Sequence, residues 1–324
     1  MDINWNLLIQ QIIIGLANGS LIALIALGYT MVYGIVELIN FAHGEVFMMG
    51  AMFAATVVGI TGVTPQSAPF VIVGAALLAL VSSMIFSASI NFGIDRIAYR
   101  RLRRAPRLAP LIAAIGFSFI LLNIGIYWKG ANPIAPPPLI PQKYRAYNVL
   151  NEWFGLDTTI RLRPLDLLVF SVTIPLLFIL TWFVYRTKTG KAMRATAQDR
   201  DAAALMGIDV NRTIGMAFVI GGALAGAAGM IALYYTSTAR FQMGFRYGLF
   251  AFTAAVLGGI GNLYGAVVGS LMIGLVWSLS DGFMKTLIGG WGAQWTPSVI
   301  FGVLVIVMVF KPSGLFGDHV PEKV

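Results

Sequence analysis

Long apolar segments dominate the chain, and most are long enough to cross a bilayer as helices, which takes about 20 mostly apolar residues. The segment 248–279 is also apolar, but Gly258-Gly259-Ile260-Gly261-Asn262 interrupts it, so it predicts either two short helices or a re-entrant pair. We therefore expect residues 1–324 to form a single all-α integral membrane domain, a polytopic bundle of about eight to ten transmembrane or re-entrant helices. The other predicted spans cover about residues 7–36, 46–60, 70–94, 108–128, 165–185, 213–235 and 297–310.

Charged residues between the apolar segments orient these spans. Residues 96–107 carry six arginines, and residues 186–212 carry six lysines or arginines. Positive loops are cytoplasmic in most membrane proteins, so we expect both loops on the cytoplasmic side. The Pro-rich loop 129–163 must then face outside, and although it is also basic, its density of positive charge is lower. The N-terminus should lie outside and residues 311–324 inside, if the first segment crosses once and the interrupted pair crosses twice.

Composition strengthens the membrane interpretation and excludes several kinds of chemistry. The chain is 58% hydrophobic and only 11% charged, whereas a soluble domain has about 25% charged residues. Its net charge of +9 is therefore attributed to cytoplasmic loops rather than to nucleic-acid binding. The lack of cysteine excludes disulfides, thiolate metal sites and cysteine nucleophiles. The N-terminus has no basic region before its first apolar segment, so we expect that segment to be retained rather than cleaved.

The basic loop 186–212 contains a pattern typical of a short capped helix. Thr196 and Asp199 resemble a capping box at the start of a helix. Gly207 suits the residue with left-handed backbone conformation that often ends one. The sequence therefore predicts a helix from Ala197 to Met206. Such a helix would carry one apolar face and several charges. The residues alone leave two interpretations open, which are docking into a partner's cleft and lying on the bilayer surface. The candidate docking residues are Ala195, Asp199, Arg200, Asp201, Ala203, Leu205, Met206 and Gly207.

Ionisable residues also lie between the first two apolar segments, at Glu37, His43 and Glu45. Such residues are costly at membrane depth and usually serve a function there. They fit either a broken helix, whose free backbone groups can bind a substrate, or a loop at the membrane surface. One histidine without further ligands does not predict a metal site. Candidate residues of a translocation pathway are Asn18, Tyr29, Glu37, Asn40, His43 and Glu45.

Glycines recur at every fourth position in two places, which we call the glycine ladders. Small residues at this spacing let helices approach, so the ladders predict close helix packing. They are Gly222/Gly226 and Gly261/Gly265/Gly269. Direct lining of a pathway is the alternative. The chain contains no G-x-x-x-x-G-K-[ST] phosphate loop, and His43 and His319 are its only histidines. We therefore predict no catalytic residue, no metal site and no bound cofactor.

Three motifs together resemble the permease family of branched-chain amino acid ATP-binding cassette (ABC) transporters, and the LivH-like subunits in particular. The first is Ala26–Gly34 followed by Leu38–Glu45, and the second is Thr189–Ala195 with Asp199 and Ala202–Ile208. The third is Leu257–Asn262 followed by Gly265–Gly269. Each motif is moderately specific, but their order and spacing across most of the chain make the resemblance strong.

The resemblance implies a multi-pass permease in a bacterial or archaeal cytoplasmic (inner) membrane. Its partners would be a second, LivM-like permease, two cytoplasmic ATPases that use ATP and Mg²⁺, and an extracytoplasmic binding protein. It also implies that Ala195–Gly207 is a coupling helix that docks on an ATPase. The substrate would be branched-chain or other apolar amino acids. A urea or amide permease of the same superfamily and a secondary transporter are the alternatives, and a membrane enzyme is disfavoured because His, Cys and paired carboxylates are scarce.

Overall fold

The computed structural model describes residues 5–36, 40–103, 105–106, 108–139, 148–155, 159–287 and 294–317. Within these ranges the chain is helical, and the only strand-like pairing is an isolated bridge between Ile134 and Ala239. Seven of the described helices are long and apolar enough to cross a membrane, and two shorter apolar helices accompany them. The prediction of an all-α polytopic bundle is therefore confirmed.

The long helices match the predicted spans to within a few residues. The helix α1 is continuous despite its four glycines, and α2 begins at His43, three residues before the predicted start. The helix α3 continues past its predicted end through a π-helical turn, η1 (Asp95–Tyr99), into α4 (Arg100–Leu102). The long helices are α1 (Trp5–Val36), α2 (His43–Thr61), α3 (Pro69–Ile94), α5 (Leu108–Lys129), α8 (Pro164–Arg186), α11 (Val210–Tyr235) and α13 (Leu263–Leu287).

The interrupted apolar segment forms two helices joined by a tight turn, α12 (Met243–Gly258) and α13. Gly259 and Gly261 adopt φ values of +104° and +95°, which glycine tolerates best. Asn262 accepts a 3.0 Å hydrogen bond from the Gly265 amide, which fixes the start of α13. The amides of Leu315 and Phe316, which follow α14 (Thr296–Phe310), donate to carbonyls of Leu257 and Gly258 and cover the turn.

Burial divides the helices into an inner and an outer group. In the most apolar windows of α1 and α11, 78% of the residues are buried, against 22% in the windows of α3, α5 and α8. Large apolar side chains of the outer helices, such as Phe119, Phe178 and Trp182, are exposed. Exposed apolar surface on this scale fits contact with lipid or with another membrane subunit, and not contact with water.

The glycine ladders lie at close helix crossings, with one exception. A Cβ atom added to Gly222 or Gly226 would lie closer than 3.0 Å to carbonyl oxygens of α3, and one added to Gly265 or Gly269 would meet the backbone of α12 as closely. Gly261 differs, because it belongs to the α12–α13 turn and its nearest contact is with Gly34. It was wrongly predicted as a helix-packing glycine, because a four-residue spacing takes no account of where a helix begins.

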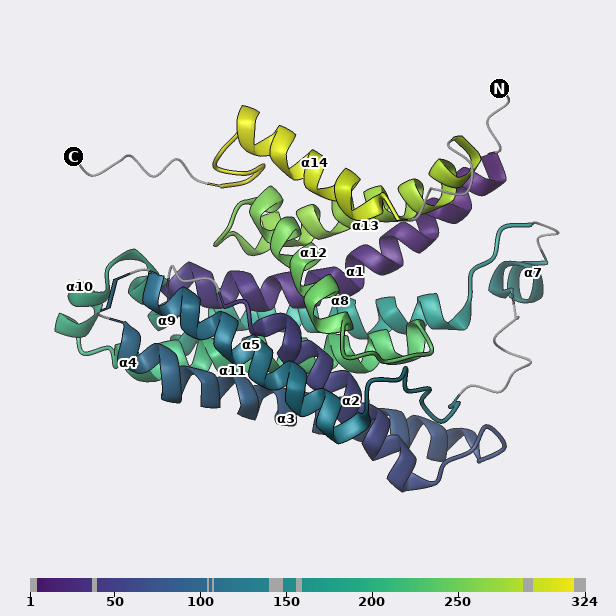
Figure 1. Ribbon diagram of the computed structural model, residues 1–324, viewed down its shortest axis with the longest axis horizontal. Coiled ribbons are helices and arrows are strands. Elements are labelled where there is room, and N and C mark those ends of the chain that lie inside the picture. The colour runs from purple at the N-terminus through teal and green to yellow at the C-terminus, as the bar shows by residue number, and fades with distance from the viewer. Residues whose placement is uncertain are drawn as a thin grey trace.

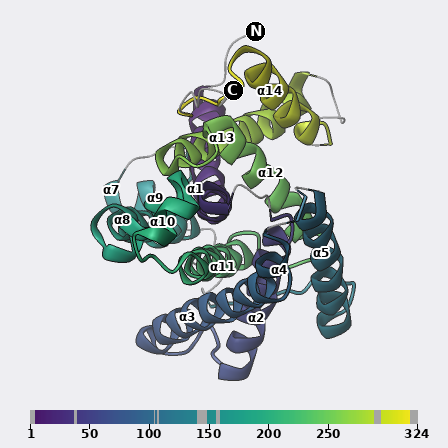
Figure 2. The same cartoon turned by 90° about the vertical axis from the view of Figure 1, so that its left-hand side faces the viewer.

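Both predicted cytoplasmic loops lie at one end of the molecule (Figures 1 and 2). This end, called the basic end below, contains α4, α9 (Lys188–Gln198), α10 (Arg200–Leu205) and the α12–α13 turn. The opposite end contains the start of α1 and the short helix α7 (Val149–Phe154) of the Pro-rich loop. The two basic loops thus lie on one side and the Pro-rich loop on the other, as the loop charges predicted.

Candidate functional site

The chain enters α2 inside the bundle rather than at its surface. An added Cβ atom at Gly28 would lie closer than 3.0 Å to the ring of His43, so the side chain of the first residue of α2 packs against α1 well before that helix ends. Gly28 lies eight residues before Val36 at the end of α1, which corresponds to about 12 Å along the helix axis. The structure therefore supports the broken-helix interpretation of this segment and not the surface loop. Glu37 lies outside the described residues.

A chain of amide side chains holds the entry into α2 in place. The buried Asn40 accepts a 3.1 Å hydrogen bond from the amide of Ala42 and donates one of 3.1 Å to Asn91 on α3. Asn91 in turn donates a 2.7 Å hydrogen bond to the carbonyl of Phe218 on α11. Asn40, just before α2, is thus hydrogen-bonded to α3 and, through Asn91, linked to α11. Asn40 was predicted from the sequence, but Asn91 was not, because it lies 51 residues away with no local motif around it.

Polar groups with unused hydrogen-bonding capacity surround the start of α2. His43 and Glu45 are each only 1% exposed, and both ring nitrogens of His43 and Oε2 of Glu45 have no hydrogen-bond partner among the described residues. The Tyr29 ring contacts the His43 ring at a centroid distance of 4.8 Å. An unpaired polar group buried away from water costs about 1–3 kcal/mol. A site that retains several of them is a candidate for binding a polar ligand.

Close backbone contacts bring α12 against this polar site. Cβ atoms added at Gly44 or Gly244 would each collide with the other residue's backbone, and Gly244 also lies against the carboxyl group of Glu45. Gly248 of α12 also lies against Gly44 and the hydroxyl of Tyr29. We call Tyr29, Asn40, His43 and Glu45 the buried polar cluster. Asn18 is not part of it, because eleven residues of continuous helix separate it from Tyr29, or about 16 Å.

The predicted coupling helix is in fact two short helices. The helix α9 ends at Gln198, and α10 begins at Arg200 after an extended Asp199. The Asp199 side chain caps α10 by accepting 2.9 Å hydrogen bonds from the amides of Asp201 and Ala202. The predicted cap at Thr196 was wrong, because Thr196 lies within α9 and donates to the carbonyl of Ala192. Gly207 has φ +84° and ends the segment as predicted.

The two helices expose part of the predicted docking surface. Leu205 is 88% exposed and Met206 83% exposed, which is costly for apolar side chains in water. Asp199, Asp201 and Gly207 are also exposed, while Ala195 is half-buried. Ala203 is buried and points inward, so it does not belong to the surface on which it was predicted. An exposed apolar tip of this kind fits either a protein partner or the bilayer surface, the two interpretations that the sequence left open.

One contact that the sequence analysis missed links α10 to the membrane core. The half-buried Arg200 donates hydrogen bonds from Nη2 to the carbonyls of Val36, at 2.6 Å, and Ile35, at 3.1 Å. These carbonyls belong to the last turn of α1, where a cation is electrostatically favourable. The helix that presents Leu205 and Met206 is therefore attached directly to the segment that leads into the buried polar cluster.

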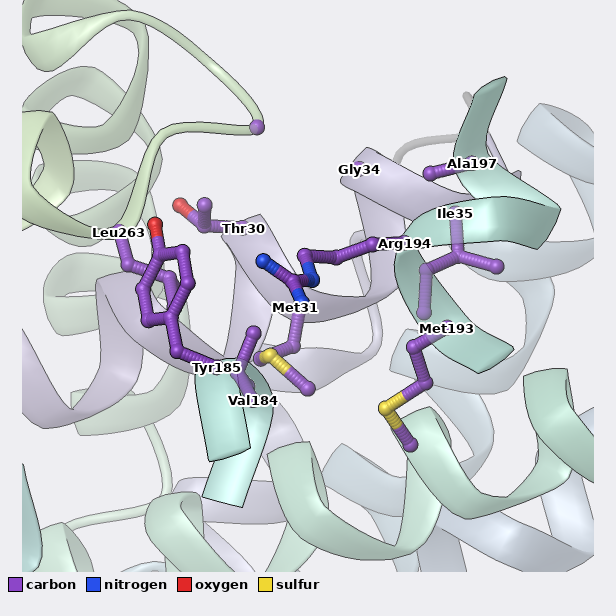
Figure 3. Close-up of a pocket in the computed structure, with 11 residues that line it drawn as sticks. Thr30, Met31, Gly34, Ile35, Val184, Tyr185, Met193, Arg194, Ala197 and Leu263 are labelled. Atoms are coloured by element: carbon purple, nitrogen blue, oxygen red, sulfur yellow. The ribbon is translucent and has the colours of Figure 1, made fainter. Parts of the chain in front are cut away.

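Beside this link, α9 covers a cavity of about 110 Å³ between α1, α8 and the start of α13 (Figure 3). The guanidinium of Arg194 reaches into it and lies 5.1 Å from the centre of the Tyr185 ring. Met31 and Ile35 of α1 and Met193 of α9 form apolar walls. The cavity leaves α9 incompletely packed against the helices beneath it. The Arg200 hydrogen bonds are therefore an important part of the attachment of α9 and α10 to α1.

Comparisons with known proteins agree with the sequence motifs. Residues 11–309 match the family described as branched-chain amino acid transport system, permease component. The chain is 39% identical to the high-affinity branched-chain amino acid transport system permease protein BraD of Pseudomonas aeruginosa, over 98% of both chains. It is 35% identical to LivH of Salmonella typhimurium, over 98% of this chain and 97% of that one.

A probable branched-chain amino acid transport permease protein, LivH of Methanocaldococcus jannaschii, is 27% identical over 92% of this chain and 89% of its own. The family match and the two closer relatives each cover nearly the whole chain, so the similarity includes the buried polar cluster, α9 and α10. The chain is a multi-pass membrane protein and belongs to the branched-chain amino acid transport system permease family.

Proposed function

We propose that the chain is the membrane-spanning permease subunit of an ABC importer and translocates branched-chain or other apolar amino acids. The observation that carries this proposal is the 39% identity to a branched-chain amino acid permease over 98% of both chains. Phe41, where related urea permeases often have methionine, is a weaker argument for amino acids. An extracytoplasmic binding protein would deliver the substrate to the end of the molecule that contains α7.

The energy source would lie in partner subunits. The sequence contains no phosphate-binding loop, so ATP would be hydrolysed by two cytoplasmic ATPases. A second permease, either a LivM-like subunit or a second copy of this chain, would complete the pathway. By the positive-inside rule the basic end would face the cytoplasm. The membrane would be a bacterial or archaeal inner membrane.

A physical route for coupling follows from the contacts at the basic end. We propose that α10 docks in a cleft of the ATPase through Leu205 and Met206, and that closure of the ATPases moves α10. The Arg200 hydrogen bonds would carry that motion to Val36 at the end of α1. The connection to α2 would then shift against the Asn40–Asn91 contact and change access to the buried polar cluster. Access would alternate between the two sides of the membrane.

The buried polar cluster is the part of the chain best suited to contact a zwitterionic substrate. Glu45 offers a carboxylate oxygen without a hydrogen-bond partner in the described structure, and a substrate ammonium group could supply one. At the start of α2 the amide of His43 donates to the carbonyl of Asn40, and Ala42 provides no side-chain cap for the amides that follow. Helix N-termini of this kind favour a carboxylate. The two features together match the two charges of an amino acid.

The proposal is tested by purifying the tagged chain in mild detergent and identifying the proteins that co-purify. Two ATPases and a second permease are expected. The reconstituted complex should then take up leucine and valine with ATP, and should continue after the proton gradient is collapsed. Uptake that stops with the proton gradient would assign the chain to secondary transport. Uptake of urea in place of leucine would overturn the substrate assignment but not the ABC mechanism.

A further inference from the structure

A second cavity, of about 480 Å³, lies between α3 and α11 at the basic end, and none of its lining residues belongs to α10 or to the buried polar cluster. Figures 1 and 2 both show these two helices side by side. Nothing in the proposed transport mechanism uses this cavity. Its walls are formed by Phe92, Asp95, Arg96, Arg100, Asp209, Asn211, Arg212, Gly215, Met216 and Val219.

The cavity has an apolar half and a basic half, because the residues that line it on both helices change from apolar to basic toward the basic end. Phe92 on α3 is followed by Arg96 on η1 and Arg100 on α4 at four-residue spacing, and all three line the cavity. On α11, which runs antiparallel to α3, the order is Arg212 and then Met216 and Val219. The arginines of both helices thus lie toward the basic end, and the apolar side chains lie deeper in the span.

The basic half keeps an excess of positive charge. Asp95 is already paired with Arg103, whose Nη2 lies 2.6 Å from its Oδ1, and Asn211 accepts a hydrogen bond from the same guanidinium. Asp209 caps α11 by accepting a 3.0 Å hydrogen bond from the amide of Arg212. In the part of the chain that the structure describes, the guanidinium groups of Arg96, Arg100 and Arg212 form no ion pair.

The apolar half is shaped by a close contact between the two helices. A Cβ atom added at Gly215 would lie 3.3 Å from the ring of Phe92, so a glycine there lets the ring lie against α11. Arg96 is stacked over the same ring, with Cζ 5.4 Å from its centroid. Phe92 of α3 therefore contacts α11 with its ring and lies next to Arg96 of the basic half.

We propose that this cavity binds the headgroup of an anionic phospholipid. Its phosphodiester would lie among Arg96, Arg100 and Arg212, and the upper part of its acyl chains would lie along Phe92, Met216 and Val219. Basic pockets between membrane helices on the cytoplasmic side are suited to such headgroups. A free phosphate would use only the basic half. An acidic segment of a partner protein would approach from water and would not need the apolar half at membrane depth.

The test is native mass spectrometry of the delipidated complex with added phosphatidylglycerol or phosphatidylcholine. An arginine near an anionic lipid is worth about fivefold in affinity. Arg96→Gln and Arg212→Gln should therefore each weaken phosphatidylglycerol binding about fivefold and leave phosphatidylcholine binding unchanged. The matched control is Arg186→Gln, an exposed arginine at the end of α8 outside the cavity. It should bind phosphatidylglycerol like the wild type.

Several outcomes would overturn the assignment. Equal binding of the two lipids would remove the role of headgroup charge, and an equal loss in Arg186→Gln would show a general effect of net charge. Displacement of phosphatidylglycerol by equimolar glycerol 3-phosphate would assign the cavity to a soluble phosphate. Exclusion of the lipid whenever an ATPase is bound would assign it to a protein partner. Unchanged phosphatidylcholine binding and thermal stability in the variants show that a loss is not due to misfolding.

Discussion

The guanidinium of Arg200 donates a 2.6 Å hydrogen bond to the carbonyl oxygen of Val36, which joins the first turn of α10 to the last turn of α1. The two residues are 164 positions apart in sequence. This bond connects the exposed tip of α10 with the helix that leads into the buried polar cluster. The proposed coupling therefore passes through one defined contact, between Arg200 Nη2 and the Val36 carbonyl oxygen. Substitutions at this contact and near it test the proposal.

Replacing Arg200 with Gln should uncouple ATP hydrolysis from transport. The coupling free energy between two sites is typically about 1–3 kcal/mol, so we expect leucine uptake to fall at least about fivefold while the subunits still assemble. Arg200→Lys should keep part of the activity, because one ammonium group can still donate to one of the carbonyls. Lys188→Gln removes an exposed charge on α9 and serves as the control. Wild-type uptake by Arg200→Gln would remove this bond from the mechanism.

Replacing Leu205 with Asp should weaken ATPase binding without affecting the fold, because the side chain is 88% exposed. Burying an uncompensated carboxylate in an apolar cleft costs several kcal/mol. The ATPases should therefore be lost in co-purification. Ala131→Asp adds the same charge at an exposed position that follows α5, in the loop that leads to α7, and should retain them. Full retention of ATPases by Leu205→Asp would place the docking surface elsewhere.

Gly207→Val should impair transport by straining the turn that ends α10. Gly207 has φ +84°, and a left-handed conformation costs a non-glycine residue about 1–2 kcal/mol, with β-branched residues affected most. Gly207→Asn should be milder, because Asn tolerates this conformation. Gly116→Val on α5, where an added Cβ has open space, tests for a general effect. Membrane insertion should be normal in all three, and uptake by Gly207→Val equal to that of Gly116→Val would contradict the prediction.

Asn40 and Asn91 should depend on each other for their contribution to stability. Each single change to Ala leaves a buried amide unpaired, which costs about 1–3 kcal/mol. The double variant should lose less than the sum of the two single variants, with a coupling of at least about 0.5 kcal/mol. Thermal unfolding in detergent measures all four proteins of the cycle. Strictly additive losses would mean that the hydrogen bond contributes little.

Glu45→Gln should change uptake kinetics without loss of subunit assembly. The substitution keeps the shape of a buried side chain but removes a charge that could pair with the substrate ammonium. A hydrogen bond to a charged group contributes about 1.5–3 kcal/mol, so KM or the maximal rate should change by at least about tenfold. Glu152→Gln on α7, exposed at the opposite end, is the control. Kinetics identical to those of the control would exclude Glu45 from the pathway.

The spans and the stop at Gly207 could be predicted because each depends on a short stretch of sequence. An apolar segment in a bilayer must satisfy its own backbone hydrogen bonds and therefore becomes a helix wherever it lies. The helix stop depends on one residue that tolerates positive φ. The division of α9 from α10 was missed because Thr196 and Asp199 are both good caps. In the structure Thr187 caps α9, which places Thr196 inside that helix and leaves Asp199 as the cap of α10.

The sequence by itself determined that this protein is a helical membrane permease of a recognisable family, and it identified Tyr29, Asn40, His43 and Glu45 as residues of interest. Only the tertiary structure decided that these residues are buried together, that Asn91 holds Asn40, and that Arg200 reaches Val36. The same holds for the cavity between α3 and α11. The physical reason is that such contacts join positions 51 to 164 residues apart, and helix packing, rather than any local pattern, brings them within hydrogen-bonding distance.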